Sequence, residues 1–306
     1  MKKKQDLCFR NRKKINFRRD WQLYALLAIP FVYFIIFKYV PMYGVVISFK
    51  NFNIFQGIME SPWVGMQNFI QLFKLPGFYK ALRNTLLLNL IDLLFSFPMP
   101  IILSLCLNEI MGIKFKKFSQ TVLYLPYFLS WAVVGGIMYQ LFSTNTGLVN
   151  IVMGTKIPFL TNKYSWLVTY LVSGVWQSAG WNTIIYLAAI SGIDQSLYEA
   201  TEVDGGGILT KMWHVTLPGI KSTIVLLLIM KLGSMMTISF ERPFVMGNTL
   251  VTDFSEVLST FVYRIGMQGG KFSFATAAGL FQSVVGLVLI STANFISNRL
   301  GEQGIW

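Results

Sequence analysis

The residues of this sequence whose side chains suit ligand chemistry are few, and most of them lie inside long apolar stretches. One stretch contains WQSAGWN, residues 176–182, which combines two indole rings with two amides. Aromatic rings stack on the C–H face of a sugar, and amides exchange hydrogen bonds with its hydroxyl groups. Trp176, Gln177, Trp181 and Asn182 are therefore typical of a helix face that contacts a saccharide. The small residues between them favour close helix packing, which is the competing interpretation.

Weaker candidates for the same role come from other apolar stretches. They are Tyr127, Trp131, Ser234, Thr237 and Ser239. Asp92 and Lys231 are ionisable residues near the middle of apolar runs, where polar groups are costly and usually functional. An ion pair within this chain, or with a second chain, is favoured over proton coupling, because one isolated carboxylate makes a poor relay.

The sequence shows no recognisable catalytic or metal-binding pattern. His214 is the single histidine, and Cys8 and Cys106 make neither a metal spacing nor a disulfide framework. Residues 205–211, GGGILTK, lack the glycine directly before the lysine that a phosphate-binding loop requires. We therefore expect a chain that is not an enzyme and has no catalytic residue, metal or cofactor of its own.

Composition and charge place the chain in a membrane. Of its 306 residues 54% are hydrophobic and 13% charged, whereas a soluble domain has about 25% charged residues. The formal net charge is +13, and nine of the cations fall within residues 2–19, ahead of the first apolar run. Such a cluster is a topology signal, and no base-reading pattern accompanies it, so nucleic-acid binding is not expected.

Six apolar stretches are each near the length of about 20 residues that spans a bilayer. They are residues 21–49, 82–107, 121–142, 165–190, 223–240 and 275–295. Their apolar character is continuous rather than alternating, which predicts helices rather than a barrel. The predicted fold is thus an all-α integral membrane protein with six transmembrane helices, in contact with lipid.

The basic residues predict its orientation. Residues 1–20 form a basic leader on the cytoplasmic side, and residues 21–306 form one transmembrane domain. Both the amino and the carboxyl terminus are then cytoplasmic, as is the loop of residues 196–218 between the fourth and fifth spans.

This loop is strongly patterned for a connection between two spans. Ser196 followed by Glu199 makes a capping-box pattern that starts a short helix. Residues 204–207, DGGG, break it, because glycine tolerates the left-handed conformations of a sharp turn. A second short helix resumes at Ile208 and ends at Leu217–Pro218. The helix-turn-helix is predicted to dock into a partner, with a plain interfacial connector as the alternative.

The spacing in this loop resembles the EAA motif of ABC importer permeases. The matching positions are Tyr198, Glu199, Ala200, Asp204, Gly205, Leu217 and Pro218. The sequence departs from the family pattern at Thr201, Gly206, Met212 and Val215, all small or conservative changes. In that family the loop forms coupling helices that sit in a cleft of a separate ATPase subunit.

Other segments resemble the carbohydrate-uptake branch of that family, particularly its lipo-oligosaccharide and polysaccharide-type permeases. They are PMYGVVISFKNF at residues 41–52, the stretch from residue 239 to 289, and the tail NRLGEQGIW. The resemblance implies a permease in the bacterial cytoplasmic membrane that moves an oligosaccharide or polysaccharide fragment by alternating access.

The same resemblance implies several partner chains. A second homologous permease, two ABC ATPase subunits that bind ATP and Mg²⁺, and an extracellular solute-binding protein are expected. Two other hypotheses stay open: a membrane scaffold that binds a cytoplasmic partner without transport, and a secondary transporter. A secondary transporter typically shows inverted repeats and paired broken helices, which the sequence does not reveal.

Overall fold

The computed structural model describes residues 17–299, and the extended regular elements in that range are all helices. An isolated bridge between Lys50 and Trp63 is the β-type pairing found there. Most of the predicted basic leader, both chain termini and most of the tail NRLGEQGIW lie outside the described residues. The all-α class predicted from the sequence is confirmed for the described range.

The helices follow one another along the chain with short connections. The first part contains α1 (Phe17–Phe34), a π-helical segment (Ile35–Tyr39), a 3-10 segment (Val40–Phe49), α2 (Gly57–Glu60), α3 (Gln67–Leu72), α4 (Pro76–Phe95), α5 (Pro98–Asn108) and α6 (Ile113–Tyr124). The central part contains a 3-10 turn (Leu125–Phe128), α7 (Trp131–Phe142), α8 (Leu148–Met153), α9 (Lys163–Ser191), α10 (Gln195–Val203), α11 (Ile208–Lys211), a π-helical segment (Met212–Thr216) and α12 (Leu217–Gly219). The last part contains α13 (Lys221–Gly233), α14 (Glu241–Met246), α15 (Thr252–Ser255), α16 (Leu258–Tyr263), a π-helical segment (Arg264–Gln268) and α17 (Phe272–Arg299).

Several of these helices could cross a membrane. By length and composition three stretches qualify: Tyr24–Phe49, Pro76–Asn108 and Phe272–Arg299. The number rises to five if two bent pairs, Ile113–Phe128 with Trp131–Phe142 and Ile208–Gly219 with Lys221–Gly233, are each one span. The helix α9 is long enough to span a membrane, with 29 residues, but it is not among these stretches. Its Ser, Thr, Gln and Asn side chains lower its mean hydropathy. A multi-pass membrane protein follows, while the count of six spans stays a prediction.

The predicted third span, residues 121–142, is not one straight helix. The chain bends by 101° between the segments that end at Phe128 and begin at Trp131. Pro126 has no N–H to donate, and a short 3-10 turn replaces the α-helix around it. Ser130 then starts α7 by accepting a hydrogen bond from the N–H of Val133 at 3.4 Å.

The predicted fifth span, residues 223–240, is helical only as far as Gly233. The Ser234 hydroxyl donates to the carbonyl of Lys231 at 2.9 Å, a local bond that competes with continuation of the helix. Gly233 also lies so close to α17 that a Cβ there would be 2.7 Å from the Cβ of Ile290. Residues 234–240 are non-helical, although their sequence is largely apolar.

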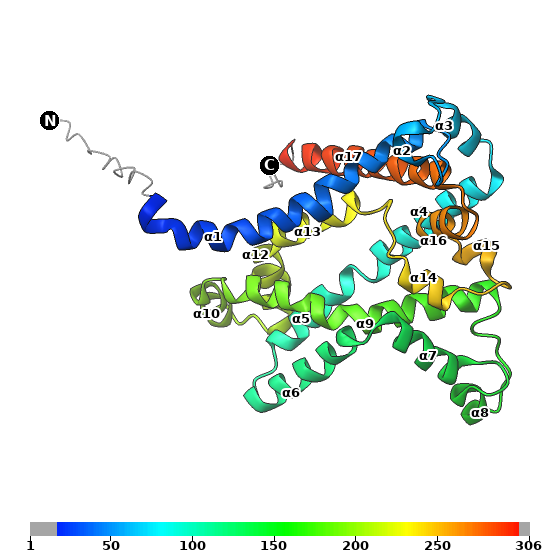
Figure 1. Cartoon of the computed structure of the whole chain (residues 1–306). Coiled ribbons are helices and arrows are strands. Elements are labelled where there is room, and N and C mark those ends of the chain that lie inside the picture. The colour runs from blue at the N-terminus through cyan, green and yellow to red at the C-terminus, as the bar shows by residue number, and fades with distance from the viewer. Residues whose placement is uncertain (1–16, 300–306) are drawn as a thin grey trace.

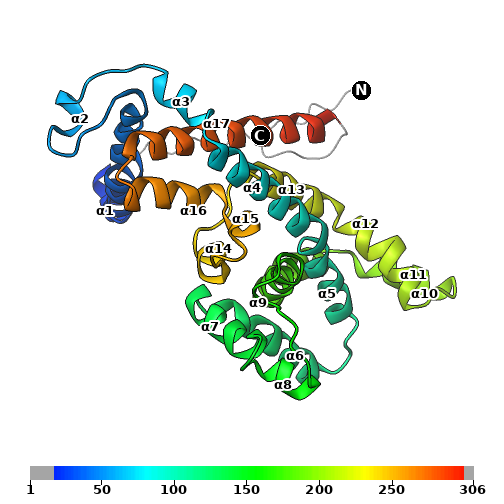
Figure 2. The same ribbon diagram turned by 90° about the vertical axis from the view of Figure 1, so that its right-hand side faces the viewer.

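The helix α9 occupies the centre of the bundle. Figure 2 looks nearly along it and shows α5, α6, α7 and α14 around it. Its contacts with α5, α6, α4 and α13 agree with that view. Eleven of its residues are buried, including the fully buried Trp166 and Tyr170. The buried face of α9 is covered by protein and can carry polar side chains, whereas Val168, Val172 and Ile185 on its other faces are exposed.

The two ends of the bundle differ in structure. The start of α1, the end of α17 and the α10–α11 pair lie toward one end of the molecule (Figure 1). The short helices α2, α3, α8, α15 and α16 lie toward the other end (Figure 1). There Phe78 and Phe261 pack with Leu72 and Leu258 in one buried cluster. The segment of residues 241–271 is a set of short helices that contributes to the core.

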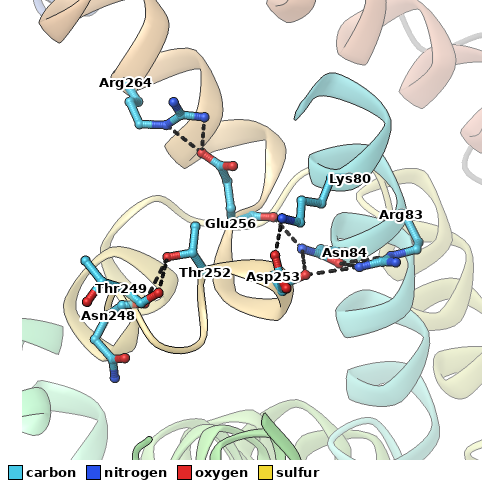
Figure 3. Close-up of polar contacts among 9 residues, drawn as sticks. All are labelled: Lys80, Arg83, Asn84, Asn248, Thr249, Thr252, Asp253, Glu256 and Arg264. Carbon is cyan, nitrogen blue, oxygen red and sulfur yellow. Dashed lines mark hydrogen bonds and ion pairs between the residues drawn. The ribbon is translucent and has the colours of Figure 1, made fainter. Parts of the chain in front are cut away.

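Asn84 on α4 fixes one of these short helices, α15. Its amide donates to the backbone carbonyls of Asp253 and Glu256, each at 2.9 Å. Lys80 pairs with Asp253, and Arg264 pairs with Glu256 at 2.6 Å, as Figure 3 shows. The hydrogen bond and positive charge of Lys80 hold the pKa of the Asp253 carboxyl below its usual range.

We predict that Asn84→Leu destabilises the protein by roughly 1–3 kcal/mol, because it leaves the buried Glu256 carbonyl without its donor and the Asp253 carbonyl with Arg83 alone. Unfolding of the purified chain by SDS in mixed micelles measures this change. Asn248→Leu is the matched control, because Asn248 is exposed and donates to a single carbonyl, that of Leu160. Equal losses for the two variants would contradict a special role of Asn84.

Candidate functional site

A cavity of about 580 Å³ lies at the middle of the bundle. Its walls come from α4, α5, α9, α13 and the non-helical residues 234–239. Unwound backbone at membrane depth is tolerated where it lines a cavity, and this is how many transporters build substrate sites.

Three of the residues predicted to lie along a substrate path line this cavity: Gln177, Asn182 and Ser239. The weaker candidates Trp131, Ser234 and Thr237 line it too. The structure thus brings together amide, hydroxyl and indole groups from separate segments of the chain. This lining can exchange hydrogen bonds with a polyhydroxylated ligand and stack against it.

The other three predicted path residues, Trp176, Trp181 and Tyr127, are not among the residues that line the cavity. Trp181 and Tyr127 stack on each other, with ring centroids 4.8 Å apart and planes at 5°. Trp176 is 42% exposed and directly precedes Gln177, so it points about 100° away around the helix. Trp181 follows Gln177 by one helical turn, but its ring stacks on Tyr127 and is not part of the cavity lining.

An ion pair that the sequence does not reveal lies in the cavity wall. Asp92 on α4 pairs with Arg242 on α14, with Nη1 and Oδ2 3.0 Å apart. Asp92 also accepts a hydrogen bond from the Ser96 hydroxyl at 3.2 Å. The partner of Asp92 within the chain is therefore Arg242, and the suggested Asp92–Lys231 pair is not formed. The sequence does not single out Arg242, because the continuous apolar run hides the point where helix α13 ends.

Arg242 is held by a tight set of contacts. Its guanidinium lies 3.6 Å from the Tyr170 ring centroid and donates to the Tyr170 carbonyl. Gly174 makes room for it, because a Cβ there would be 2.2 Å from Nη2. Within the described part of the chain, Nε of Arg242 and the Tyr170 hydroxyl are buried without a hydrogen-bond partner. Both residues line the cavity.

The second candidate site is the loop between α9 and α13. Helix α10 begins at Gln195, and its cap is Asp194, which accepts from the N–H of Ser196 at 3.0 Å. The predicted cap at Ser196 is wrong by two residues, because Asp194 has extended backbone and reaches the first turn. The hydrogen bond from the Ser196 N–H lowers the pKa of the Asp194 carboxyl.

The turn of this loop needs glycine for two different reasons. Gly205 has a φ of +76°, the left-handed region that other residues rarely adopt. Gly206 is crowded, since a Cβ there would lie 2.6 Å from Cγ2 of Thr201. An ion pair between Lys211 and Glu202 crosses the turn and joins α11 to α10. The predicted helix-turn-helix conformation is present in the structure.

The loop is anchored at its base and exposed at its tip. The Tyr198 hydroxyl lies 3.0 Å from that of the fully buried Thr216. The second short helix ends at Gly219, within one residue of the predicted end at Leu217–Pro218, and the chain then bends by 60° into α13. Five of the predicted coupling residues are exposed: Glu199, Ala200, Asp204, Gly205 and Pro218. The apolar side chains of Val203, Leu209 and Trp213 are also 87%, 70% and 67% exposed. Clustered exposed apolar residues of this kind mark a surface that another molecule covers.

The whole fold is similar to that of known transporter subunits. One crystal structure, of a bacterial ABC transporter involved in the import of the acidic polysaccharide alginate, contains a chain with 38% identity and a TM-score of 0.85. That match covers 92% of this chain and 97% of the other. A chain of the alginate transporter in complex with an alginate pentasaccharide-bound periplasmic protein matches with 37% identity and a TM-score of 0.84, over 94% and 98% of the two chains.

Residues 75–302 match the family described as binding-protein-dependent transport system inner membrane components. The polygalacturonan/rhamnogalacturonan transport system permease protein YteP of Bacillus subtilis is 43% identical, over 97% of this chain and 94% of its own length. The protein LplB of the same organism is 42% identical, over 94% and 92%. The chain belongs to this family of membrane permeases, as its EAA-like loop predicted.

Proposed function

We propose that this chain is the permease subunit of an ATP-driven ABC importer that carries an oligosaccharide or polysaccharide fragment across the bacterial cytoplasmic membrane. The observation that carries the proposal is the polar cavity beside the unwound residues 234–239, at the centre of an apolar bundle. Such a cavity is suited to a ligand that needs many hydrogen bonds and excludes lipid. The saccharides named for the similar permeases support the same ligand class.

In this proposal the chain has six spans. Counting α9 with the three long helices and the two bent pairs gives that number. Residues 1–20 form a cytoplasmic leader and residues 21–306 a single transmembrane domain, with both termini cytoplasmic. The α10–α11 end of the bundle then faces the cytoplasm, and the α15–α16 end faces outward. The charge distribution of the sequence supports this orientation.

The loop of residues 196–218 is proposed to couple the permease to its ATPase. Exposed Glu199 and the turn at Gly205 would sit in a cleft of the ATPase, with Val203 and Leu209 against its apolar surface. ATP binding closes the ATPase pair and moves the coupling helices together, which opens the cavity outward. Hydrolysis restores the inward-facing state. This chain contributes no catalytic group to that cycle.

The proposed assembly contains a second homologous permease, two ATPase subunits and an extracellular binding protein. The complex of an alginate transporter with its periplasmic protein supports the last of these. Six spans of a single chain enclose only part of a route wide enough for a saccharide, which is the reason to expect a second permease.

The test is purification of the chain in mild detergent from its native membrane, followed by assay of ATP hydrolysis. We expect an ABC ATPase and a second permease to copurify, and hydrolysis to rise severalfold when a saccharide-loaded binding protein is added. Recovery without an ATPase, under conditions that preserve other membrane complexes, would support the scaffold hypothesis. Uptake driven by an ion gradient without ATP would support a secondary transporter.

A further inference from the structure

The cavity carries an unbalanced positive charge. Three charged residues line it, the anion Asp92 and the cations Arg242 and Lys231. Asp92 and Arg242 neutralise each other through their contact at 3.0 Å. Lys231 makes no ion pair with any residue of the described range 17–299. One cation therefore remains inside the bundle without a carboxylate partner.

The location of Lys231 makes this cation available to a ligand. It lies in the last turn of α13, two residues before the helix ends at Gly233. The carbonyl groups at that helix terminus favour a cation but supply only part of a negative charge. A charged side chain in an apolar segment is normally paired with another group. Lys231 fits that rule when an anion occupies the cavity.

The polar groups of the described residues that line the cavity beside Lys231 include no free carboxylate. The Nε of Arg242 and the hydroxyl of Tyr170 have no partner in the described part of the chain, but both atoms are buried out of reach of a ligand. The carboxylate of Asp92, by contrast, already accepts hydrogen bonds from Arg242 and Ser96. An anionic ligand would meet the ammonium group of Lys231 and the exposed amide of Asn182, whereas a cationic ligand would meet no free carboxylate in this wall.

We propose that Lys231 is a specificity-determining residue that selects acidic saccharides by pairing with a uronate carboxylate. This inference rests on the proposed function and names the class of substrate that the cavity accepts. Gln177 and Asn182 contact the neutral hydroxyl groups of the same sugar.

The experiment measures binding of charged and uncharged forms of one sugar chain to the purified permease–ATPase complex without a binding protein. The probes are tetragalacturonate and tetramannuronate, each as the free acid and as the methyl ester. Esterification removes the charge and keeps the ring and its hydroxyl groups. Omitting the binding protein ensures that any discrimination belongs to the permeases.

For the wild-type complex we expect at least one acid to bind about tenfold or more tightly than its ester, as a charged hydrogen bond allows. Lys231→Met should remove that preference and leave binding of the ester unchanged. Lys231→Arg should keep the preference, because it keeps the charge. Lys117→Met, which removes a cation from exposed α6 outside the cavity, is the matched control and should behave as wild type.

Two results would overturn the inference. One is an unchanged preference for the acid in the Lys231→Met complex, and the other is a wild-type complex that binds neither acid better than its ester. The proposed importer function fails on a different result, the absence of any saccharide-dependent ATP hydrolysis with the binding protein present. A complex with stimulated hydrolysis but no charge preference would therefore retain the importer function and refute the role of Lys231.

Discussion

Replacing Arg242 with methionine is expected to destabilise the protein by about 3–5 kcal/mol, the usual cost of removing one partner from a buried ion pair. Asp92 and Arg242 are both nearly buried, with side chains 13% and 10% exposed. Without Arg242, the Asp92 carboxylate keeps the Ser96 hydroxyl as a donor but loses the opposing charge. The loss should appear as SDS-induced unfolding of the purified chain at a lower detergent fraction.

The double variant Asp92→Asn/Arg242→Met separates pairing from packing. If an uncompensated charge causes the loss, neutralising Asp92 should recover much of the stability, since apolar replacement of both partners of a buried pair is often tolerated. The methionine keeps most of the volume that fills the space beside Gly174 and the Tyr170 ring. A double variant as unstable as the single one would show that the lost contacts with Tyr170 and Trp131 dominate.

Lys80→Met is the control for this experiment. Lys80 pairs with Asp253 at the far end of α4, and the carboxylate is 72% exposed. Water replaces the lost partner at such a site, so the unfolding midpoint should move little. A large shift for Lys80→Met would mean that the assay responds to any lost cation rather than to burial.

The positions of the membrane-spanning helices can be predicted from the sequence better than the residues at which they end. Continuous apolar runs locate the membrane-spanning helices, because hydrocarbon leaves the backbone no other partner than itself. They do not locate helix ends, and α13 stops at Gly233 although Met235, Met236 and Ile238 continue the apolar run. At that point Gly233 packs against Ile290 of α17, a tertiary contact that the local sequence does not reveal.

Some residues of the candidate cavity can likewise be predicted from the sequence, and others cannot. Gln177 and Asn182 can be selected from the sequence, because polar groups inside an apolar run usually face the interior of the bundle. The partner of Asp92 lies 150 residues away in the chain, and no local pattern connects the two. Sequence proximity alone suggests Trp176 and Trp181, whereas the packing of α9 against Tyr127 decides which side each ring occupies.

The loop of residues 196–218 is the most predictable segment, because its features are local. Glycine at a sharp turn follows from the φ of +76° that Gly205 adopts. The cap is misplaced in the sequence-based prediction only because two residues near the helix start, Asp194 and Ser196, both have capping side chains. The proposed docking role of the loop depends on the surface of a partner chain, and the sequence of this chain does not describe that surface.

Gly205→Val is expected to reduce saccharide uptake by the assembled importer on the order of tenfold or more. A β-branched residue at a φ of +76° is strained by about 1–3 kcal/mol, and the turn would relax to another shape. The fold should survive, because a Cβ at Gly205 meets no atom within 4 Å. Basal ATP hydrolysis should persist while its stimulation by the loaded binding protein is lost.

Two further variants decide whether the conformation of the turn is the cause. Gly205→Asn adds a side chain that tolerates the left-handed region, so it should transport better than Gly205→Val. Gly207→Ala is the matched control, because Gly207 has a φ of −77° and open space around its Cβ position. It should transport as wild type does. Normal uptake by Gly205→Val, with the complex intact, would contradict coupling through this turn. It would mean that the conformation of the turn in the ATPase cleft does not affect transport.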